Sequence, residues 1–353
     1  MRTLLGKPTF LPFEFQTLPY RTWLASIDRA MRNSKLLHAI SMESTILCLL
    51  WLTVFSLASA DAMAEAGSRY YFSGDGYLHI VSERNGAAYE GRYRQGGDRY
   101  AESAYRSLCR VFDAPYESRH EGLSLRLIEF IDYLQDRMRP GALITVTSGY
   151  RSPEYNTKLR DKGILAAKAS LHQYGMAADL KIEGVAPRRI WEAVKSLGFG
   201  GTGYYHGDTV HIDVGPARSW DEKSSGVGTG ISDDNKLIGL VADFDRYHPG
   251  DSLRLRFIRM TAFPITVNPR FTLIKEPISG SSRSIIDFNP AFGHGVQTRC
   301  FGFENIAQMV SIQWTLPPDI QPGRYRIHAT FCCNPWKVMP GEVATPFIEV
   351  VSP

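Results

Sequence analysis

The stretch "SLHQYGMAADLKI" (170–182) places His172 and Asp179 seven positions apart among mostly small and apolar residues. Alone, such a pair is as typical of a buried structural histidine and a loop carboxylate as of a functional site. A second stretch, "GYYHGDTVHIDVGP" (203–216), favours a functional site because it adds four polar candidates within eight residues: His206, Asp208, His211 and Asp213.

Three of these side chains have the composition of a zinc site. A catalytic zinc ion takes three ligands from His, Asp and Glu and keeps its fourth position for water, and His172, Asp179 and His211 supply that number. Gly175 allows a tight turn, so that His172 lies on a loop and Asp179 starts the strand "DLKI". In the next strand, His211 and Asp213 point to the same face. No zinc-thiolate spacing occurs, so histidine and carboxylate would have to hold a metal.

Length and composition are those of an ordinary globular chain. The 353 residues are 44% hydrophobic and 22% charged, which is enough for two domains with separate cores. The net charge of +4 is small and dispersed, so we expect no nucleic-acid partner.

The N-terminal residues 1–64 are interpreted as an extension and a signal peptide. The segment "STILCLLWLTVFSLASADAMA" (44–64) combines an apolar run with small residues that suit cleavage after Ala60 or Ala64. The run is shorter than the ~20 residues of a membrane span. We therefore expect export to the periplasm, with membrane anchoring only if the segment is not cleaved.

Residues 65–220 have the mixed texture of an α+β domain. Asn85-Gly86 between two alternating runs predicts a hairpin, and apolar residues at helical spacing predict a helix over 121–138 closed by Pro140. A strand leading into Gly149, a helix beginning near Pro187 and a strand over "TVHIDVG" follow.

The rest of the chain changes character. Residues 221–236 are rich in Gly, Ser and Asp and read as a linker. Residues 237–353 contain alternating runs separated by Pro/Gly turns, which predicts a small immunoglobulin-like β-sandwich. Cys300 could form a disulfide with Cys332 or Cys333, but with only one of these neighbours because they point to opposite faces of a strand.

Three ordered motifs, "SGYRSPEYNTKLR", "SLHQYGMAADLKI" and "GYYHGDTVHIDVGPARSW", resemble the zinc D-alanyl-D-alanine peptidase family. They look closest to its periplasmic, murein endopeptidase-like branch. The resemblance covers roughly residues 70–220 and not the C-terminal domain. It implies a zinc metallopeptidase that hydrolyses D-amino-acid-containing bonds of peptidoglycan stem peptides or cross-links.

The resemblance also implies roles for individual residues. His172, Asp179 and His211 fall on the three zinc ligands, and Arg151 falls on an arginine that contacts substrate and polarises the scissile carbonyl. Asp208, three residues before the last ligand, takes the position of the catalytic base, although many members carry Glu there. The remaining candidates, His206 and Asp213, are expected to stabilise the oxyanion and to orient the ring of His211, respectively.

Two further expectations concern function. An endopeptidase is favoured over a carboxypeptidase, and the alternative is a catalytically inactive, zinc-containing cell-wall-binding or scaffold protein. The C-terminal domain is expected to contribute location or a cell-wall or protein partner rather than chemistry. On this view a chain ending near Trp220 keeps its hydrolytic activity.

Overall fold

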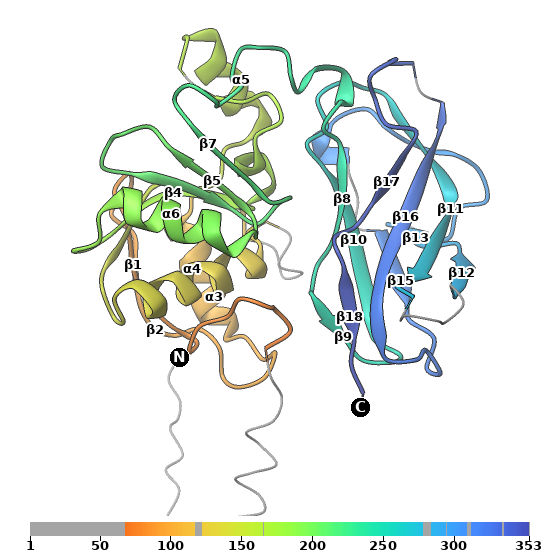
Figure 1. Cartoon of the computed structure of the whole chain (residues 1–353), viewed down its shortest axis with the longest axis horizontal. Helices are drawn as coiled ribbons and strands as arrows, with labels where there is room; N and C mark the ends of the chain where they lie inside the picture. The colour runs from red at the N-terminus through yellow and green to blue at the C-terminus, as the bar shows by residue number, and fades with distance from the viewer. Residues whose placement is uncertain are drawn as a thin grey trace, which may run out of the picture. The chain divides into compact units, whose positions relative to one another are not determined.

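A seven-stranded sheet organises the N-terminal half of the computed structural model (Figure 1). Its strand order is β2-β1-β3-β4-β6-β5-β7. The bounds are β1 Tyr77–Ser82, β2 Ala88–Arg92, β3 Ile144–Ser148, β4 Ala177–Ile182, β5 Gly201–Tyr204, β6 Val210–Asp213 and β7 Arg218–Asp221. The pairing of β1 with β2 is antiparallel, which confirms the hairpin predicted at Asn85-Gly86.

The structure describes residues 68–116, 122–164, 166–277, 284–293, 295–308, 312–333 and 335–352, all within one compact unit of the chain. The predicted signal segment 44–64 lies outside the described residues. Across these described ranges, no helix combines the length and the apolar content that crossing a membrane requires.

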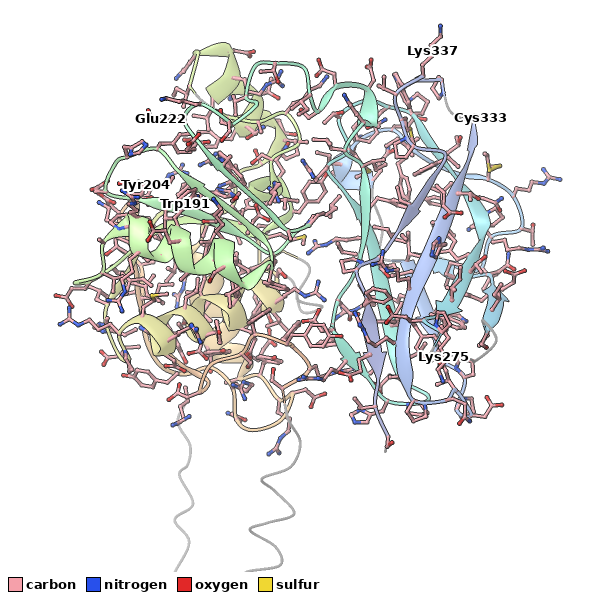
Figure 2. All side chains as sticks on the ribbon, viewed as in Figure 1. Trp191, Tyr204, Glu222, Lys275, Cys333 and Lys337 are labelled. Atoms are coloured by element: carbon pink, nitrogen blue, oxygen red, sulfur yellow. A yellow bond between two sulfur atoms is a disulfide. The ribbon has the colours of Figure 1, made fainter. Side chains whose placement is uncertain are left out.

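Four helices accompany the sheet: α3 Glu102–Val111, α4 Leu125–Met138, α5 Pro153–Asp161 and α6 Pro187–Leu197. The predicted helices α4 and α6 are confirmed. Most of α4 is buried, and α6 ends where Gly198 adopts a left-handed conformation with φ 61°. On α6, Trp191 lies near Tyr204 of β5, with ring centroids 6.3 Å apart (Figure 2). The sequence did not predict α5, because this surface helix buries only Asn156 and has little apolar periodicity.

The C-terminal region is β-rich, as its alternating texture predicted. A four-stranded sheet has the order β13-β15-β10-β8, and a second sheet has the order β12-β11-β16-β18-β9, with β14 pairing β11 and β17 pairing β16. The bounds are β8 Gly239–Ala242, β9 Arg246–Tyr247, β10 Ser252–Ile258, β11 Ile265–Lys275, β12 Ile285–Phe288, β13 Ala291–Phe292, β14 Phe301–Phe303, β15 Ile312–Thr315, β16 Gly323–Cys333, β17 Glu342–Ala344 and β18 Ile348–Val350. Its buried residues include the rings of Phe257, Phe271 and Phe303.

The predicted linker begins inside the first sheet. Asp221 is the last residue of β7, which runs parallel to β5 at the edge of the sheet. Between β7 and β8 the chain has one short 3₁₀ turn, η2 Asp233–Asn235. The domain boundaries at 64, 220 and 236 stay predictions.

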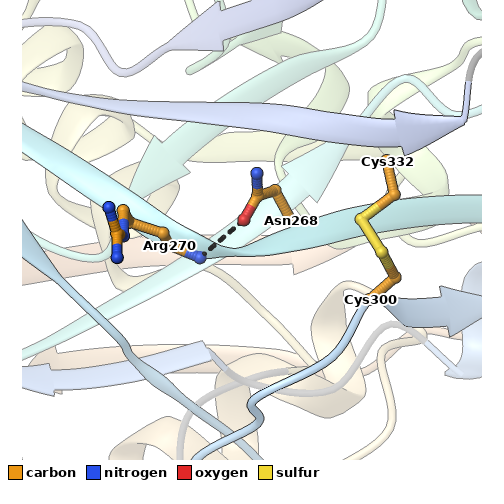
Figure 3. The surroundings of a disulfide bond; sticks show 4 residues. All are labelled: Asn268, Arg270, Cys300 and Cys332. Atoms are coloured by element: carbon orange, nitrogen blue, oxygen red, sulfur yellow. Dashed lines mark hydrogen bonds between the residues drawn. A yellow bond between two sulfur atoms is a disulfide. The ribbon is translucent and has the colours of Figure 1, made fainter.

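The disulfide joins Cys300 to Cys332, across a sequence separation of 32 residues (Figure 3). Cys333 is a free, exposed thiol (Figure 2). The structure thus selects one of the two pairings that the sequence left open, and the neighbouring thiol points elsewhere because successive side chains of a strand alternate.

Candidate metal centre and cleft

Strand pairing brings the first two site residues together. Strands β4 and β6 are antiparallel, and their register sets Asp179 directly opposite His211. The Oδ1 atom of Asp179 consequently lies 2.9 Å from Nδ1 of His211. Two residues that are 32 positions apart in the sequence thus contribute ligand atoms to one point on the sheet.

His172 reaches the same point from the 3₁₀ turn η1 Leu171–Tyr174, which immediately precedes β4. Its Nε2 lies 3.3 Å from Nδ1 of His211. The turn closes at Gly175, whose φ is 61°, and a Cβ atom there would lie 2.1 Å from the carbonyl oxygen of Gly122. Glycine is therefore required at this position both for backbone conformation and for space.

The three donor atoms fit a metal ion. Ligand atoms of His172, Asp179 and His211 all lie within 4.8 Å of one another. Nδ1 of His172 donates to the carbonyl of Gly149 at 2.6 Å, and Nε2 of His211 donates to Asp213 at 3.0 Å. Each ring therefore turns its other nitrogen, with a lone pair, toward the group, which is how metal-binding imidazoles are commonly held.

The surroundings favour the metal-binding forms of His172 and Asp179. Burial of His211 is outweighed by hydrogen bonds to Asp179 and Asp213, which raise its pKa, so that a metal would have to displace its proton. Burial lowers the pKa of His172 and favours the neutral ring. Burial opposes ionisation of Asp179, but contacts with His172 and His211 outweigh it and hold the pKa of Asp179 well below its usual range. Arg151 binds the other oxygen of this carboxylate, with Nη2 2.6 Å from Oδ2. The predicted substrate arginine is thus also an ion-pair partner of a ligand.

Asp208 and His206 are not among the three grouped ligand residues, and their catalytic roles stay predictions. The Asp208 side chain is 78% exposed, and its carboxylate lies 2.7 Å from Nζ of Lys181. His206 is exposed and packs beside the ring of Tyr204. Lys181 follows Asp179 by two residues on β4, on the same face of the strand, and gives the Asp208 carboxylate a counter-charge.

The three candidate ligands line a cleft of about 870 Å³. Tyr205 and Trp220 line it as well, and Nε1 of Trp220 donates to the hydroxyl of Tyr205 at 2.7 Å. The indole packs so closely over Gly203 that a Cβ atom there would lie 2.5 Å from it. Sequence reasoning assigned neither aromatic residue to the site. Trp220 carries no spacing signal of its own and is placed by the pairing of β7 with β5.

Comparison with known proteins shows what the N-terminal half is similar to. Residues 74–220 match a peptidase family model described as Peptidoglycan L,D-endopeptidase MepK. The resemblance to zinc D-alanyl-D-alanine peptidases that the three motifs predicted is therefore confirmed for this part of the chain. The β-rich C-terminal region lies outside the match.

Individual relatives support the same assignment. Peptidoglycan L,D-endopeptidase MepK of Escherichia coli strain K12 is 46% identical over 78 residues, which cover 22% of this chain and 43% of the relative. Probable peptidoglycan L,D-endopeptidase MepK of Haemophilus influenzae is 40% identical over 80 residues, with the same coverage of 22% and 43%. The chain thus spans less than half the length of these curated relatives.

Proposed function

We propose that the protein is a zinc-dependent peptidoglycan endopeptidase. The observation that carries the proposal is the convergence of two oriented imidazole nitrogens and one carboxylate oxygen, within 4.8 Å, in a segment that matches a peptidoglycan peptidase family. This donor set is one that catalytic zinc sites use. The relatives' description as L,D-endopeptidases favours cleavage of a bond between an L and a D centre within a cross-link.

Zinc held by His172, Asp179 and His211 would polarise a peptide carbonyl and lower the pKa of a coordinated water to about 7. The protein's own groups position these partners. Gly149 and Asp213 fix the two rings, and the carboxylate of Asp179 is held by Arg151.

Two cleft residues are suited to stabilise the negative charge that develops on the carbonyl oxygen. Arg151 stays the predicted substrate-contacting cation. Tyr205 is a second donor, because burial raises the pKa of its phenol, which therefore stays protonated at neutral pH. Its oxygen already accepts from Trp220, so its own proton is available to a ligand in the cleft.

The remaining expectations extend the proposal to the whole chain. Export to the periplasm agrees with a peptidoglycan substrate. The two C-terminal sheets agree with an immunoglobulin-like sandwich. A cell-wall or protein partner of this region stays a prediction.

The test is metal analysis combined with digestion of purified muropeptides. The wild-type protein should hold one zinc ion and release products whose masses identify the cleaved bond. His172→Ala and His211→Ala should lose metal and hydrolysis together, since each removes one of three ligands. Full zinc occupancy in both variants would refute the ligand assignment.

One observation favours a second candidate, a zinc-containing cell-wall-binding or scaffold protein without hydrolytic activity. The predicted base Asp208 is not among the residues that line the cleft and is paired with Lys181. Stoichiometric zinc and binding to isolated peptidoglycan, without any released product, would establish this second function. Hydrolysis by the wild-type protein excludes it.

A further inference from the structure

A residue from the β-rich region reaches the cleft of the candidate metal centre. Arg259 follows directly after β10 and lines the same cleft as His172, Asp179 and His211. Residues of the segment 224–233 also line it. The family match ends at residue 220, so the peptidase family does not account for this wall of the cleft.

The backbone around Arg259 is docked on the turn that carries His172. The amide of Met260 donates to the hydroxyl of Tyr174 at 3.1 Å, and Tyr174 is the last residue of η1. Arg259 itself has a φ of 61°, a left-handed conformation that is uncommon for a residue with a side chain. Such conformations persist where the surrounding structure holds them, and they are frequent at functional sites.

The guanidinium of Arg259 differs in its pairing from three other cations of the cleft. Arg151, Lys168 and Arg218 contact the carboxylates of Asp179, Asp233 and Asp213, respectively. Within the described part of the chain, Nε of Arg259 is buried and has no hydrogen-bond partner. The negative charge of Asp213 acts to raise the pKa of Arg259, but this carboxylate already binds His211 and Arg218.

A cation whose buried Nε has no hydrogen-bond partner is suited to bind an anion from the cleft. Burial, followed by the nearby charge of Arg218, lowers the pKa of Arg259 to about 10, so the group is still charged at neutral pH. A partly desolvated charge without a partner is costly. A planar guanidinium is suited to a carboxylate, to which it can donate two parallel hydrogen bonds.

We propose that Arg259 binds a carboxylate of the peptide substrate, so that the β-rich region completes the substrate site. The inference rests on the proposed peptidase function and names one determinant of its specificity. The substrate class is a peptide with a free α- or side-chain carboxylate near the scissile bond. Conversion of that carboxylate to a carboxamide removes the charge and should weaken binding.

The experiment compares wild-type protein, Arg259→Gln and Arg259→Lys as full chains. The control is Arg270→Gln, which changes an exposed arginine of the same β-rich region. The substrates are a muropeptide dimer with free carboxylates and the same dimer with individual carboxylates converted to carboxamides. Zinc content and the urea unfolding midpoint are measured for every variant.

The expected result is a change in KM. Hydrogen bonds to charged groups are strong enough to change affinity roughly 10- to 100-fold. For Arg259→Gln, KM should rise by that factor for the dimer with free carboxylates. KM should stay unchanged for the dimer in which the carboxylate that Arg259 binds is a carboxamide. Zinc content and kcat should stay the same. Arg259→Lys should lose part of the preference, since it keeps the charge but not the planar fork, and Arg270→Gln should behave as wild type.

The proposal is overturned if folded Arg259→Gln prefers every acid over its amide as strongly as wild type does. Should that variant not fold, an unchanged acid-to-amide ratio in Arg259→Lys overturns it equally. If wild type hydrolyses neither dimer, the peptidase function fails separately. In that case the affinities for the acid dimer and the carboxamide dimer are measured by tryptophan fluorescence. The proposal is overturned if the ratio of the two affinities is the same for wild type and Arg259→Gln.

Discussion

Replacement of Asp213 by Asn should weaken zinc binding although Asp213 is not a ligand. The side chain is fully buried. Its Oδ2 accepts from Nε2 of His211 at 3.0 Å and from Nη2 of Arg218 at 2.6 Å. Its Oδ1 accepts from the amides of Gly201 and Gly215 at 3.1 and 2.9 Å. An asparagine keeps the shape of this group but replaces one acceptor oxygen with a donor NH₂.

The magnitude follows from what that NH₂ meets. If the amide nitrogen takes the place of Oδ2, Nε2–H of His211 faces another donor, and the ring is no longer held with Nδ1 toward the metal. Loss of such a supporting contact costs metal sites 10- to 100-fold in affinity, or about 1.4 to 2.7 kcal/mol. The metal-free protein should also lose roughly 2 to 4 kcal/mol of unfolding free energy, because two charge-assisted hydrogen bonds are weakened.

The stability loss should depend on pH in a defined direction. Burial opposes ionisation of Asp213, but Arg218 and His211 hold its pKa well below the ordinary value. A depressed carboxylate contributes stability that is present above its unfolded pKa of about 4 and is lost as the pH falls toward its native value. The difference between wild type and Asp213→Asn should therefore shrink below about pH 4. Burial opposes protonation of His211, but hydrogen bonds to Asp179 and Asp213 outweigh it and raise the pKa of His211, so the part of the difference that depends on protonated His211 should also decrease as the pH rises above about 6.5.

The assay is competition for zinc with a chelator of known affinity, together with urea unfolding of the metal-free proteins. Asp208→Asn is the matched control, since it makes the same change in the loop just before β6 but on an exposed carboxylate. Its zinc affinity should stay within twofold of wild type. The reasoning fails if Asp213→Asn binds zinc as wild type does, or if Asp208→Asn weakens zinc binding equally.

Three further outcomes are expected. Burial raises the pKa of Asp132 to about 7, so its ionisation should lower the free energy of unfolding as the pH rises from about 4 to 7. This loss is worth up to ~4 kcal/mol. In urea unfolding, Asp132→Asn should therefore be more stable than wild type at pH 8 but not at pH 4. Changing Cys300 and Cys332 to Ser opens a loop of 32 residues and should cost about 4 kcal/mol in the same assay. Gly175→Ala should lose zinc on metal analysis, because the added Cβ would meet the Gly122 carbonyl.

The grouping of His172, Asp179 and His211 could be predicted from the sequence because its signals are local. The motif around His172, Gly175 and Asp179 fits in one turn and the following strand, and His211 lies in a strand with clear alternation. The contact of Asp208 with Lys181 could not be predicted in this way. Asp208 was assigned by its spacing of three residues from His211. Lys181 lies close to Asp208 only because β4 and β6 pair in the sheet.

Contacts between distant segments also decide what the C-terminal region contributes, and the sequence did not predict them. Its texture separates it from residues 65–220, and a chain ending near Trp220 is predicted to keep its hydrolytic activity. The structure instead joins the two regions through an ion pair between Arg126 and Asp245, at 2.8 Å and with both side chains buried. A buried pair is costly to break from one side, because the remaining charge is left without compensation. A chain truncated after Trp220 would therefore expose Arg126 and also lack Arg259 in the cleft, so it should be both less stable and poorer in substrate binding.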